Sequence, residues 1–387
     1  MGGSLVRAER VTLLREVSEG PLAALFAGER HTGDDVQLVA VKVLRVRRSR
    51  ELTQLGRLRD LGRRLNRLGH RNLSAPTELA VVEGRPALLS PWIEGIDLLD
   101  WAEVLRETDT VLPTRAVCEV LKSAAAALDA AMFRTAWGEA EPLAVMHRDV
   151  KPSNLMITRD GEVKLLDFST GLTSLGGRDG RGVAIRAGLG RYLSPGRRRG
   201  KRGGPSSDVY ALGLIGIELF SRRWLQRVRD TNPAHDRHLA ELVANLPDLG
   251  LRAGPDDRAL RSLLLRMVAF DADARPPAAE VAHTMRTLAD RAPGPSLEAF
   301  AHDHAFPTLP VPDEPHERLA EGALVEPEHL TSLLAAEVEE ESPEPSELEL
   351  DPPQDDNEDE DEDEVALADR EISITRIVRS SAPSLPP

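Results

Sequence analysis

The chain has 387 residues, of which 41% are hydrophobic and 29% are charged, and this balance is typical of a globular protein rather than a wholly disordered one. It has one cysteine, Cys118, which excludes an intramolecular disulfide. No stretch approaches the roughly 18 apolar residues that a membrane helix needs, and the N-terminus lacks a signal pattern, so we expect a soluble cytoplasmic protein without a membrane partner.

The net charge of −15 is unevenly distributed along the chain. Residues 292–387 carry 27 acidic and four basic residues, a net charge of −23, whereas residues 1–291 have a net charge of +8. Proline, glutamate and aspartate accumulate in the acidic part, and such a composition cannot bury enough apolar surface to offset the entropy of ordering. We therefore expect a folded domain over residues 10–291 and a disordered acidic tail over residues 292–387.

Residues up to about 90 predict a small lobe rich in β-structure. Short apolar or alternating runs indicate strands at 11–17, 22–27, 38–46, 79–82 and 86–89. Between the third and fourth of these, leucines recur at spacings of three and four and predict one amphipathic helix; they are Leu55, Leu58, Leu61, Leu65 and Leu68.

From residue 98 onward the pattern becomes helical. Residues 115–132 are rich in alanine, and further helices are expected at 208–220, 258–268 and 278–288. The chain thus predicts an α+β protein with two lobes: a β-rich N-lobe over about residues 10–90 and a larger α-helical C-lobe over about 91–291.

A hairpin within the second lobe brings polar side chains together. Strands are expected at 155–158 and 163–166, on either side of the turn formed by Asp160 and Gly161. Asn154 precedes the first strand and Asp167 follows the second, so the two residues lie at the same end of the hairpin. An amide oxygen and a carboxylate are hard ligands that suit Mg²⁺.

Three sequence motifs resemble those of serine/threonine protein kinases. His147-Arg148-Asp149-Val150-Lys151-Pro152-Ser153-Asn154 resembles the catalytic loop, Asp167-Phe168-Ser169 resembles the metal-binding DFG triplet, and Val39-Ala40-Val41-Lys42 resembles the lysine strand. The chain has only five lysines among 49 basic residues, and two of them are Lys42 and Lys151, where a compact charge differs from a guanidinium. The resemblance covers about 280 residues and implies a bilobal protein-kinase-like fold.

The resemblance implies ATP and Mg²⁺ as cofactors and a protein carrying serine or threonine as substrate. Asp149 would accept the proton of the substrate hydroxyl, and Lys151 would steady the transferring phosphate. Asn154 and Asp167 would hold Mg²⁺. The remaining expected nucleotide-binding residues are Lys42 at the inner phosphates, Gly20 in the phosphate loop, Ser90 and Trp92 in the adenine hinge, and Asp97 at the ribose.

Several supporting residues of the family are replaced. Only Gly20 of the family's three loop glycines remains, and Pro21 lacks an amide for phosphate. Leu61, with Asp60 beside it, stands where a glutamate pairs with the lysine. Ser169, Leu189 and Gly196 replace a glycine, a threonine and a glutamate. A pseudokinase that binds nucleotide or acts as a scaffold is therefore the alternative to an active enzyme.

Two charged segments bear on partners. The basic run Arg197–Arg202 lacks interleaved aromatic residues, so nucleic acid is not favoured as a partner. The acidic run Asp355–Glu364 carries the opposite charge, and the tail is expected to contact the basic catalytic domain. Ser380 and Ser381 follow Arg379 and are candidates for autophosphorylation.

Overall fold

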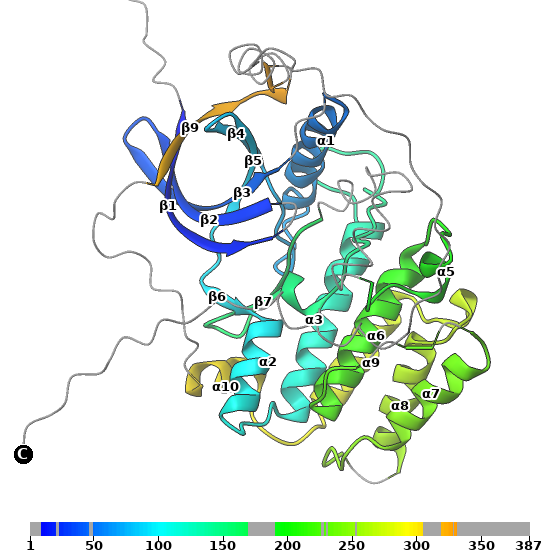
Figure 1. Cartoon of the computed structure of the whole chain (residues 1–387). Helices are drawn as coiled ribbons and strands as arrows, with labels where there is room; N and C mark the ends of the chain where they lie inside the picture. The colour runs from blue at the N-terminus through cyan, green and yellow to red at the C-terminus, as the bar shows by residue number, and fades with distance from the viewer. Residues whose placement is uncertain are drawn as a thin grey trace, which may run out of the picture.

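The computed structural model describes residues 9–20, 23–45, 49–168, 190–225, 228–229, 231–251, 254–304, 319–327 and 329–330. The described residues form a small lobe, in which one helix lies against a barrel of strands, and a larger, mainly helical lobe (Figure 1). The bilobal α+β fold predicted from the sequence is confirmed.

The small lobe is a closed barrel of antiparallel strands. In the order in which they pair, the strands are β1 (Arg10–Glu19), β2 (Ala23–Thr32), β3 (Asp35–Leu44), β5 (Arg85–Pro91), β4 (Glu78–Val82) and β9 (Ala320–Val325). Val39, Val41 and Val43 alternate along β3 and pack with Val11 and Leu89. The period of two in the sequence therefore supplies one apolar face for the barrel.

The barrel corrects the prediction that disorder begins at residue 292. Strand β9 pairs with β1 and with β4, and helix α10 (Leu297–Asp303) packs on the larger lobe through Phe300, whose ring lies 5.7 Å from that of Trp101. The prediction was wrong for these two elements because composition averages over short segments that find partners far away in the sequence. Residues 331–387 of the predicted tail lie outside the described part of the chain.

Helix α1 (Ser49–Asn66) lies against the barrel, as the leucine spacing predicts (Figure 1). Leu55 and Leu58 pack with Leu44 and Leu88 of the sheet. Leu65, further along the helix, belongs to the core of the larger lobe. One helix therefore contacts both lobes.

The larger lobe is built around helix α6 (Pro205–Ser221), in which most residues are buried. The alanine-rich helix α3 (Thr114–Phe133) packs against α6 and against α9 (Ala278–Ala289). Eleven residues of α3 are buried, and its many small alanine side chains allow this close packing. The other helices are α2 (Leu98–Glu107), α5 (Pro195–Arg198), α7 (Ala234–Ala244) and α8 (Pro255–Met267).

The predicted hairpin forms the second sheet, with β7 (Leu155–Thr158) pairing with β8 (Val163–Leu165) and with β6 (Gly95–Asp97). Gly161 has a φ of 70°, and a Cβ there would lie 2.4 Å from the Cα of Glu298. Only glycine fits this turn, because α10 approaches it closely.

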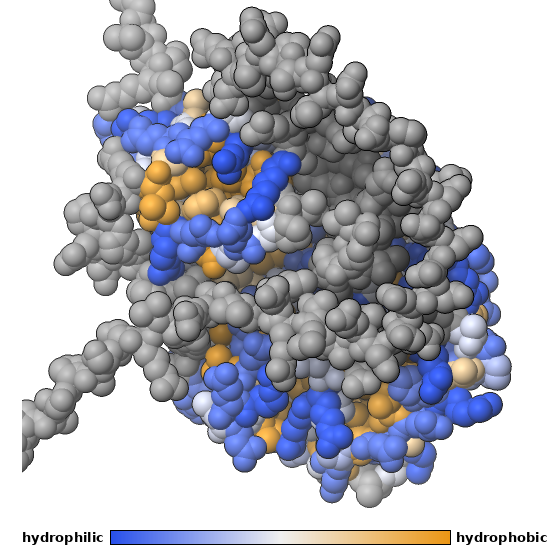
Figure 2. Space-filling model, viewed as in Figure 1, coloured by the Kyte–Doolittle hydropathy of each residue, from blue (hydrophilic) through white to orange (hydrophobic). Residues whose placement is uncertain are grey.

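No helix in the described part of the chain is long and apolar enough to cross a membrane. In Figure 2, hydrophobic residues gather where Figure 1 shows the bore of the barrel, and hydrophilic residues cover much of the visible surface of the helical lobe.

Candidate active site

The hairpin joins the two expected metal ligands at the junction of the lobes. Asn154 ends a short 3₁₀ turn before β7, and Asp167 comes two residues after the end of β8. The backbone N–H of Leu166 donates to the carbonyl of Asn154 at 2.9 Å, so the two ends of the hairpin are tied together. The predicted juxtaposition is therefore present.

Asp149 is the centre of a hydrogen-bonded group in the loop before the hairpin. Its Oδ2 accepts from Lys151 Nζ at 2.9 Å and from Asn154 Nδ2 at 3.3 Å. The same Nδ2 donates to the Asp149 carbonyl at 2.8 Å. Because the amide nitrogen of Asn154 points at Asp149, its Oδ1 is the atom left to serve as a metal ligand.

Lys42 on β3 connects the small lobe to this group. Its Nζ lies 2.6 Å from Asp167 Oδ2. Burial alone would raise the pKa of Asp167, but the Lys42 ammonium outweighs it and holds the pKa below its ordinary value. Asp167 is thus a carboxylate at neutral pH, the form that a divalent cation requires.

The backbone of the site is held in an uncommon conformation. Arg148 has a φ of 68° and Asp167 a φ of 60°, and such left-handed geometry costs a non-glycine residue about 1–3 kcal/mol. The buried carboxylate of Asp208 on α6 accepts from the N–H groups of His147 at 2.9 Å and Arg148 at 2.7 Å. Burial raises the pKa of Asp208, while the charge of His147 and these two hydrogen bonds oppose that rise.

His147 links the loop to the residues after β8. Its Nε2 donates to the carbonyl of Leu166 at 2.6 Å, and its Nδ1 accepts from the N–H of Asp149 at 3.2 Å. Its ring meets that of Phe168 edge-on, with 4.6 Å between centroids. His147 therefore joins the catalytic-loop segment to the DFG-like segment. Ser169 and Leu189 lie outside the described residues.

Helix α1 offers Lys42 no carboxylate from the two positions that the sequence indicated. Leu61 is partly buried against the core, as expected for an apolar residue there. Asp60 was a possible substitute, but 61% of its side chain is exposed and it accepts from Arg59 at 2.8 Å. Asp60 is therefore not the partner of Lys42, because it points to solvent on another face of the helix.

Gly20, Ser90 and Trp92, which are expected to bind nucleotide, lie on or next to the strands that lead to Lys42. The Gly20 N–H donates to the Ala23 carbonyl at 2.9 Å and closes the turn between β1 and β2, in which Pro21 lies outside the described residues. Ser90 on β5 pairs with Ala40, two residues before Lys42 on β3. The next residues continue toward the larger lobe, where the N–H of Trp92 donates to Leu38 at 3.4 Å.

Asp97 is used structurally in this conformation. Its Oδ1 accepts from the N–H groups of Leu99 at 2.9 Å and Asp100 at 3.1 Å, which caps the N-terminus of α2. Burial, with the charge of Asp100, raises the pKa of Asp97 to about 7. Strand pairing sets it opposite Met156 on β7, near Asn154, and its ribose contact stays a prediction.

Arg197 is a site residue that sequence reasoning missed, because it was placed in an exposed basic loop. Its Nη1 donates to the carbonyl of Arg148. Burial lowers the pKa of Arg197, and the carboxylates of Asp208 and Asp149 oppose that shift. The guanidinium therefore reaches under the catalytic loop. A run of arginines gives no local signal of which member is buried.

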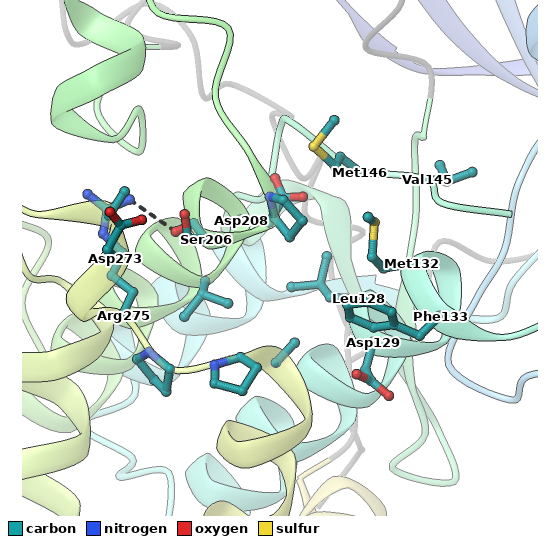
Figure 3. A pocket seen from close by; sticks show the side chains of 16 residues that line it. Leu128, Asp129, Met132, Phe133, Val145, Met146, Ser206, Asp208, Asp273 and Arg275 are labelled. Atoms are coloured by element: carbon teal, nitrogen blue, oxygen red, sulfur yellow. Dashed lines mark hydrogen bonds between the residues drawn. The ribbon is translucent and has the colours of Figure 1, made fainter. Parts of the chain in front are cut away.

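Arg275 illustrates how the fold accommodates Gly196. Without a glutamate there, Arg275 donates to the carbonyls of Ala269 at 2.8 Å and Ser206 at 3.1 Å and lies 4.8 Å from the centroid of the Tyr210 ring. Figure 3 shows the nearby cavity of about 330 Å³, which Arg275, Ser206 and Asp208 line together with apolar residues of α3. Asp149 and Asp167 do not line this cavity, so it is separate from the site.

A lysine–aspartate pair joins the two lobes. Beside it, a loop presents an aspartate, a lysine and an asparagine. This arrangement is that of a phosphotransferase of the kinase type. The model of the protein kinase domain matches residues 14–285. The chain therefore belongs to the protein kinase family.

Similar proteins come from several bacteria. Tyrosine-protein kinase MasK of Myxococcus xanthus is 30% identical over 76% of this chain and 43% of that protein. Serine/threonine-protein kinase Pkn1 of Myxococcus xanthus is 29% identical over 62% of this chain and 32% of that protein, and serine/threonine-protein kinase PknB of Mycolicibacterium smegmatis is 28% identical over 59% and 38%. The matched part thus spans less than half the length of each relative.

Among solved structures, the PknI kinase domain of Mycobacterium tuberculosis is similar in fold, with a TM-score of 0.51 and 21% identity. The match covers 72% of this chain and 96% of that domain.

Proposed function

We propose that this chain transfers the γ-phosphate of ATP to a serine or threonine hydroxyl of a protein. The observation that carries the proposal is the group of hydrogen bonds around Asp149, with Lys151 at 2.9 Å and Asn154 within 3.3 Å, next to the Lys42–Asp167 pair at 2.6 Å. These are the residues that phosphoryl transfer needs for positioning and charge neutralisation.

Asp149 accepts the proton of the attacking hydroxyl. The hydroxyl oxygen forms the new bond to the γ-phosphorus as the bond from that phosphorus to the oxygen of ADP breaks. Lys151 forms an ion pair with Asp149, so its ammonium lies close to the phosphoryl group on which negative charge develops. Lys42 turns from Asp167 toward the phosphates when nucleotide enters. Asn154 and Asp167 would hold Mg²⁺, which would neutralise phosphate charge; the amide and carboxylate oxygens suit this ion.

The choice of serine or threonine over tyrosine rests on Lys151, which follows Asp149 by two residues as in the serine/threonine branch. The similar protein MasK is named as a tyrosine kinase, so the acceptor hydroxyl of this chain has to be measured. Phosphoamino-acid analysis of the labelled product distinguishes the three hydroxyls, and phosphotyrosine alone would overturn this part of the proposal.

The test of catalysis uses labelled ATP, Mg²⁺ and the full chain. Asp149→Asn should abolish transfer and leave ATP binding nearly intact, whereas Asp167→Asn should also weaken Mg²⁺-dependent binding. Asp160→Asn is the matched control, because Asp160 is an exposed carboxylate at the far turn of the same hairpin. Wild-type protein that transfers no more phosphate than the Asp149→Asn variant contradicts the proposal.

The second candidate function is a pseudokinase, which binds nucleotide or a partner without transfer. Leu61 favours it, because an apolar side chain stands where the family ties the helix to the lysine. In that case wild type and Asp149→Asn should both bind ATP and neither should transfer phosphate.

A further inference from the structure

The matched kinase domain ends at residue 285, yet the described chain returns to the small lobe 34 residues later. We call residues 319–330 the C-terminal strap. It contains β9, then Glu326 and Pro327, and ends at Leu330. The strap closes the barrel and then turns across helix α1.

The strand of the strap occupies both edges of the sheet. Gly322 pairs with Val11 of β1 and with Val82 of β4. A Cβ on Gly322 would lie 2.4 Å from the carbonyl oxygen of Val81 and 2.6 Å from Cγ2 of Val82. Glycine is therefore required where the strap passes between the two strands, and the edges of β1 and β4 gain a partner for their backbone groups.

Beyond β9 the strap holds helix α1 by apolar contacts. Leu330 is fully buried with Leu55 and Leu58 of the helix. Pro327 lies against Gly56, where a Cβ would come within 2.7 Å of the proline ring. The strap thus covers the part of α1 that holds Leu55, Gly56 and Leu58.

An ion pair between Arg59 and Glu326 also joins the strap to helix α1. Arg59 of α1 is 6% exposed, and its Nη1 donates to the Glu326 carboxylate at 2.5 Å. The other side of the same guanidinium donates to Asp60. A buried arginine that lost Glu326 would keep only one carboxylate, so the pair favours the docked strap.

Helix α1 matters for the site because it touches both lobes. Leu61 and Leu65 lie with Phe168 in the core of the larger lobe, and Phe168 follows Asp167 directly. Lys42 pairs with Asp167, and Asp60 and Leu61 give it no carboxylate on the helix. The position of α1 is therefore set by packing and by the strap.

We propose that the C-terminal strap positions helix α1 for phosphoryl transfer, with Glu326 and Leu330 as positioning residues that take the place of the tie to Lys42 that Asp60 and Leu61 do not supply. The activity part of this inference rests on the proposed function. The strap acts through Arg59, Leu55 and Leu58 rather than by touching the nucleotide.

Two measurements on the full-length protein test the strap: amide hydrogen exchange of residues 55–66, and the kcat and KM for ATP. Glu326→Arg places two cations together and should release the strap. Exchange of α1 should then rise, and kcat/KM should fall about tenfold or more, because small displacements of positioning groups have large kinetic effects. Leu330→Asp should act in the same way.

The charge reversal Arg59→Glu combined with Glu326→Arg should restore both protection and kcat/KM, which a general loss of stability would not do. Asp60→Asn is the matched control. It removes the other carboxylate from Arg59 and leaves the strap contact, so exchange of α1 should stay at the wild-type level.

The outcomes separate the strap from the chemistry. If wild type transfers phosphate but Glu326→Arg and Leu330→Asp keep wild-type exchange and kcat/KM, the strap proposal is wrong. If wild type transfers no phosphate, the proposed function fails, and the exchange of α1 with the charge-reversed pair still decides whether the strap holds the helix. Unchanged exchange there overturns the proposal.

Discussion

Asp208 accepts a hydrogen bond from the backbone N–H of Arg148 at 2.7 Å, and this contact fixes the strained turn that presents Asp149. The acceptor comes from the central buried helix α6, so the rigid core of the larger lobe sets the geometry of the loop.

Asp208→Ala should therefore damage both folding and transfer. It leaves the N–H groups of His147 and Arg148 without this acceptor, at about 1–3 kcal/mol for each buried donor. Chemical unfolding and kcat/KM are the measurements. Asp256→Asn is the control, because Asp256 is also buried but pairs with Arg291 at 2.9 Å. It should lower stability without lowering kcat, and wild-type kcat/KM in Asp208→Ala would refute the link.

Lys42→Met should change the pH dependence of stability. In the wild type the folded pKa of Asp167 is lowered, so its carboxylate stabilises the fold above its ordinary pKa of 3.8, and that contribution is lost as pH falls through the folded value. Without Lys42, burial is still opposed by the charge of Lys151 but no longer by that of Lys42, so we expect the folded pKa of Asp167 to rise and its ionisation to stabilise the fold less. The stability gap between wild type and variant should widen as pH rises from 4 to 7.

Urea unfolding at several pH values measures this gap. Lys201→Met serves as control, because Lys201 is exposed and should give a gap that is flat with pH. Adding Asp167→Asn to Lys42→Met should remove the widening. A gap that stays constant in Lys42→Met would show that the two groups do not interact in solution.

Arg197→Met should lower kcat with little change in the KM for ATP. Arg197 contacts the Arg148 carbonyl, so its loss loosens the loop that carries the base and leaves the nucleotide residues in place. We expect a loss of about tenfold. Arg202→Met removes an exposed arginine from the same run and should be silent. Equal rates for both variants would return Arg197 to the role of a surface residue.

Local sequence patterns predicted the fold well where the paired segments are close together in the sequence. The Asp160-Gly161 turn fixed the register of the hairpin, and hence the approach of Asn154 and Asp167. The contact between Lys42 and Asp167 spans 125 residues. The family resemblance assigned both residues to the nucleotide site but did not predict that they contact each other.

The sequence could not reveal features that depend on distant partners. Strand β9 is a short run of small residues around Gly322, and its pairing edges on β1 and β4 lie some 240 to 310 residues earlier. Its surroundings are acidic, so composition predicted disorder. Arg197 is similar: the next two residues are also arginines, and only its position near the carboxylates of Asp208 and Asp149 distinguishes it.

The acidic tail that is predicted to contact the catalytic domain begins later than the sequence indicated. Removing everything after Arg291 would delete α10 and the strap, so the tail proper is residues 331–387, with 19 acidic and three basic residues. Several basic residues of the domain already have partners: Arg59 pairs with Glu326, Arg64 with Glu139 and Arg71 with Glu162. The exposed Lys201 and Arg202 of the basic run are the better targets.

A chain ending at Leu330 should therefore bind an acidic protein substrate more tightly than the full chain at low salt. The tether gives the tail a local concentration on the order of millimolar, and exposed charges lose their attraction when salt shortens the screening length to roughly 8 Å or less. The difference should disappear at high salt, and mass spectrometry should find phosphate on Ser380 or Ser381 of the full chain. Neutralising Lys201 and Arg202 should remove the difference between the two chains, because the tail then has no basic site to occupy. Equal affinity of the two chains at low salt would mean that the tail does not compete for the site.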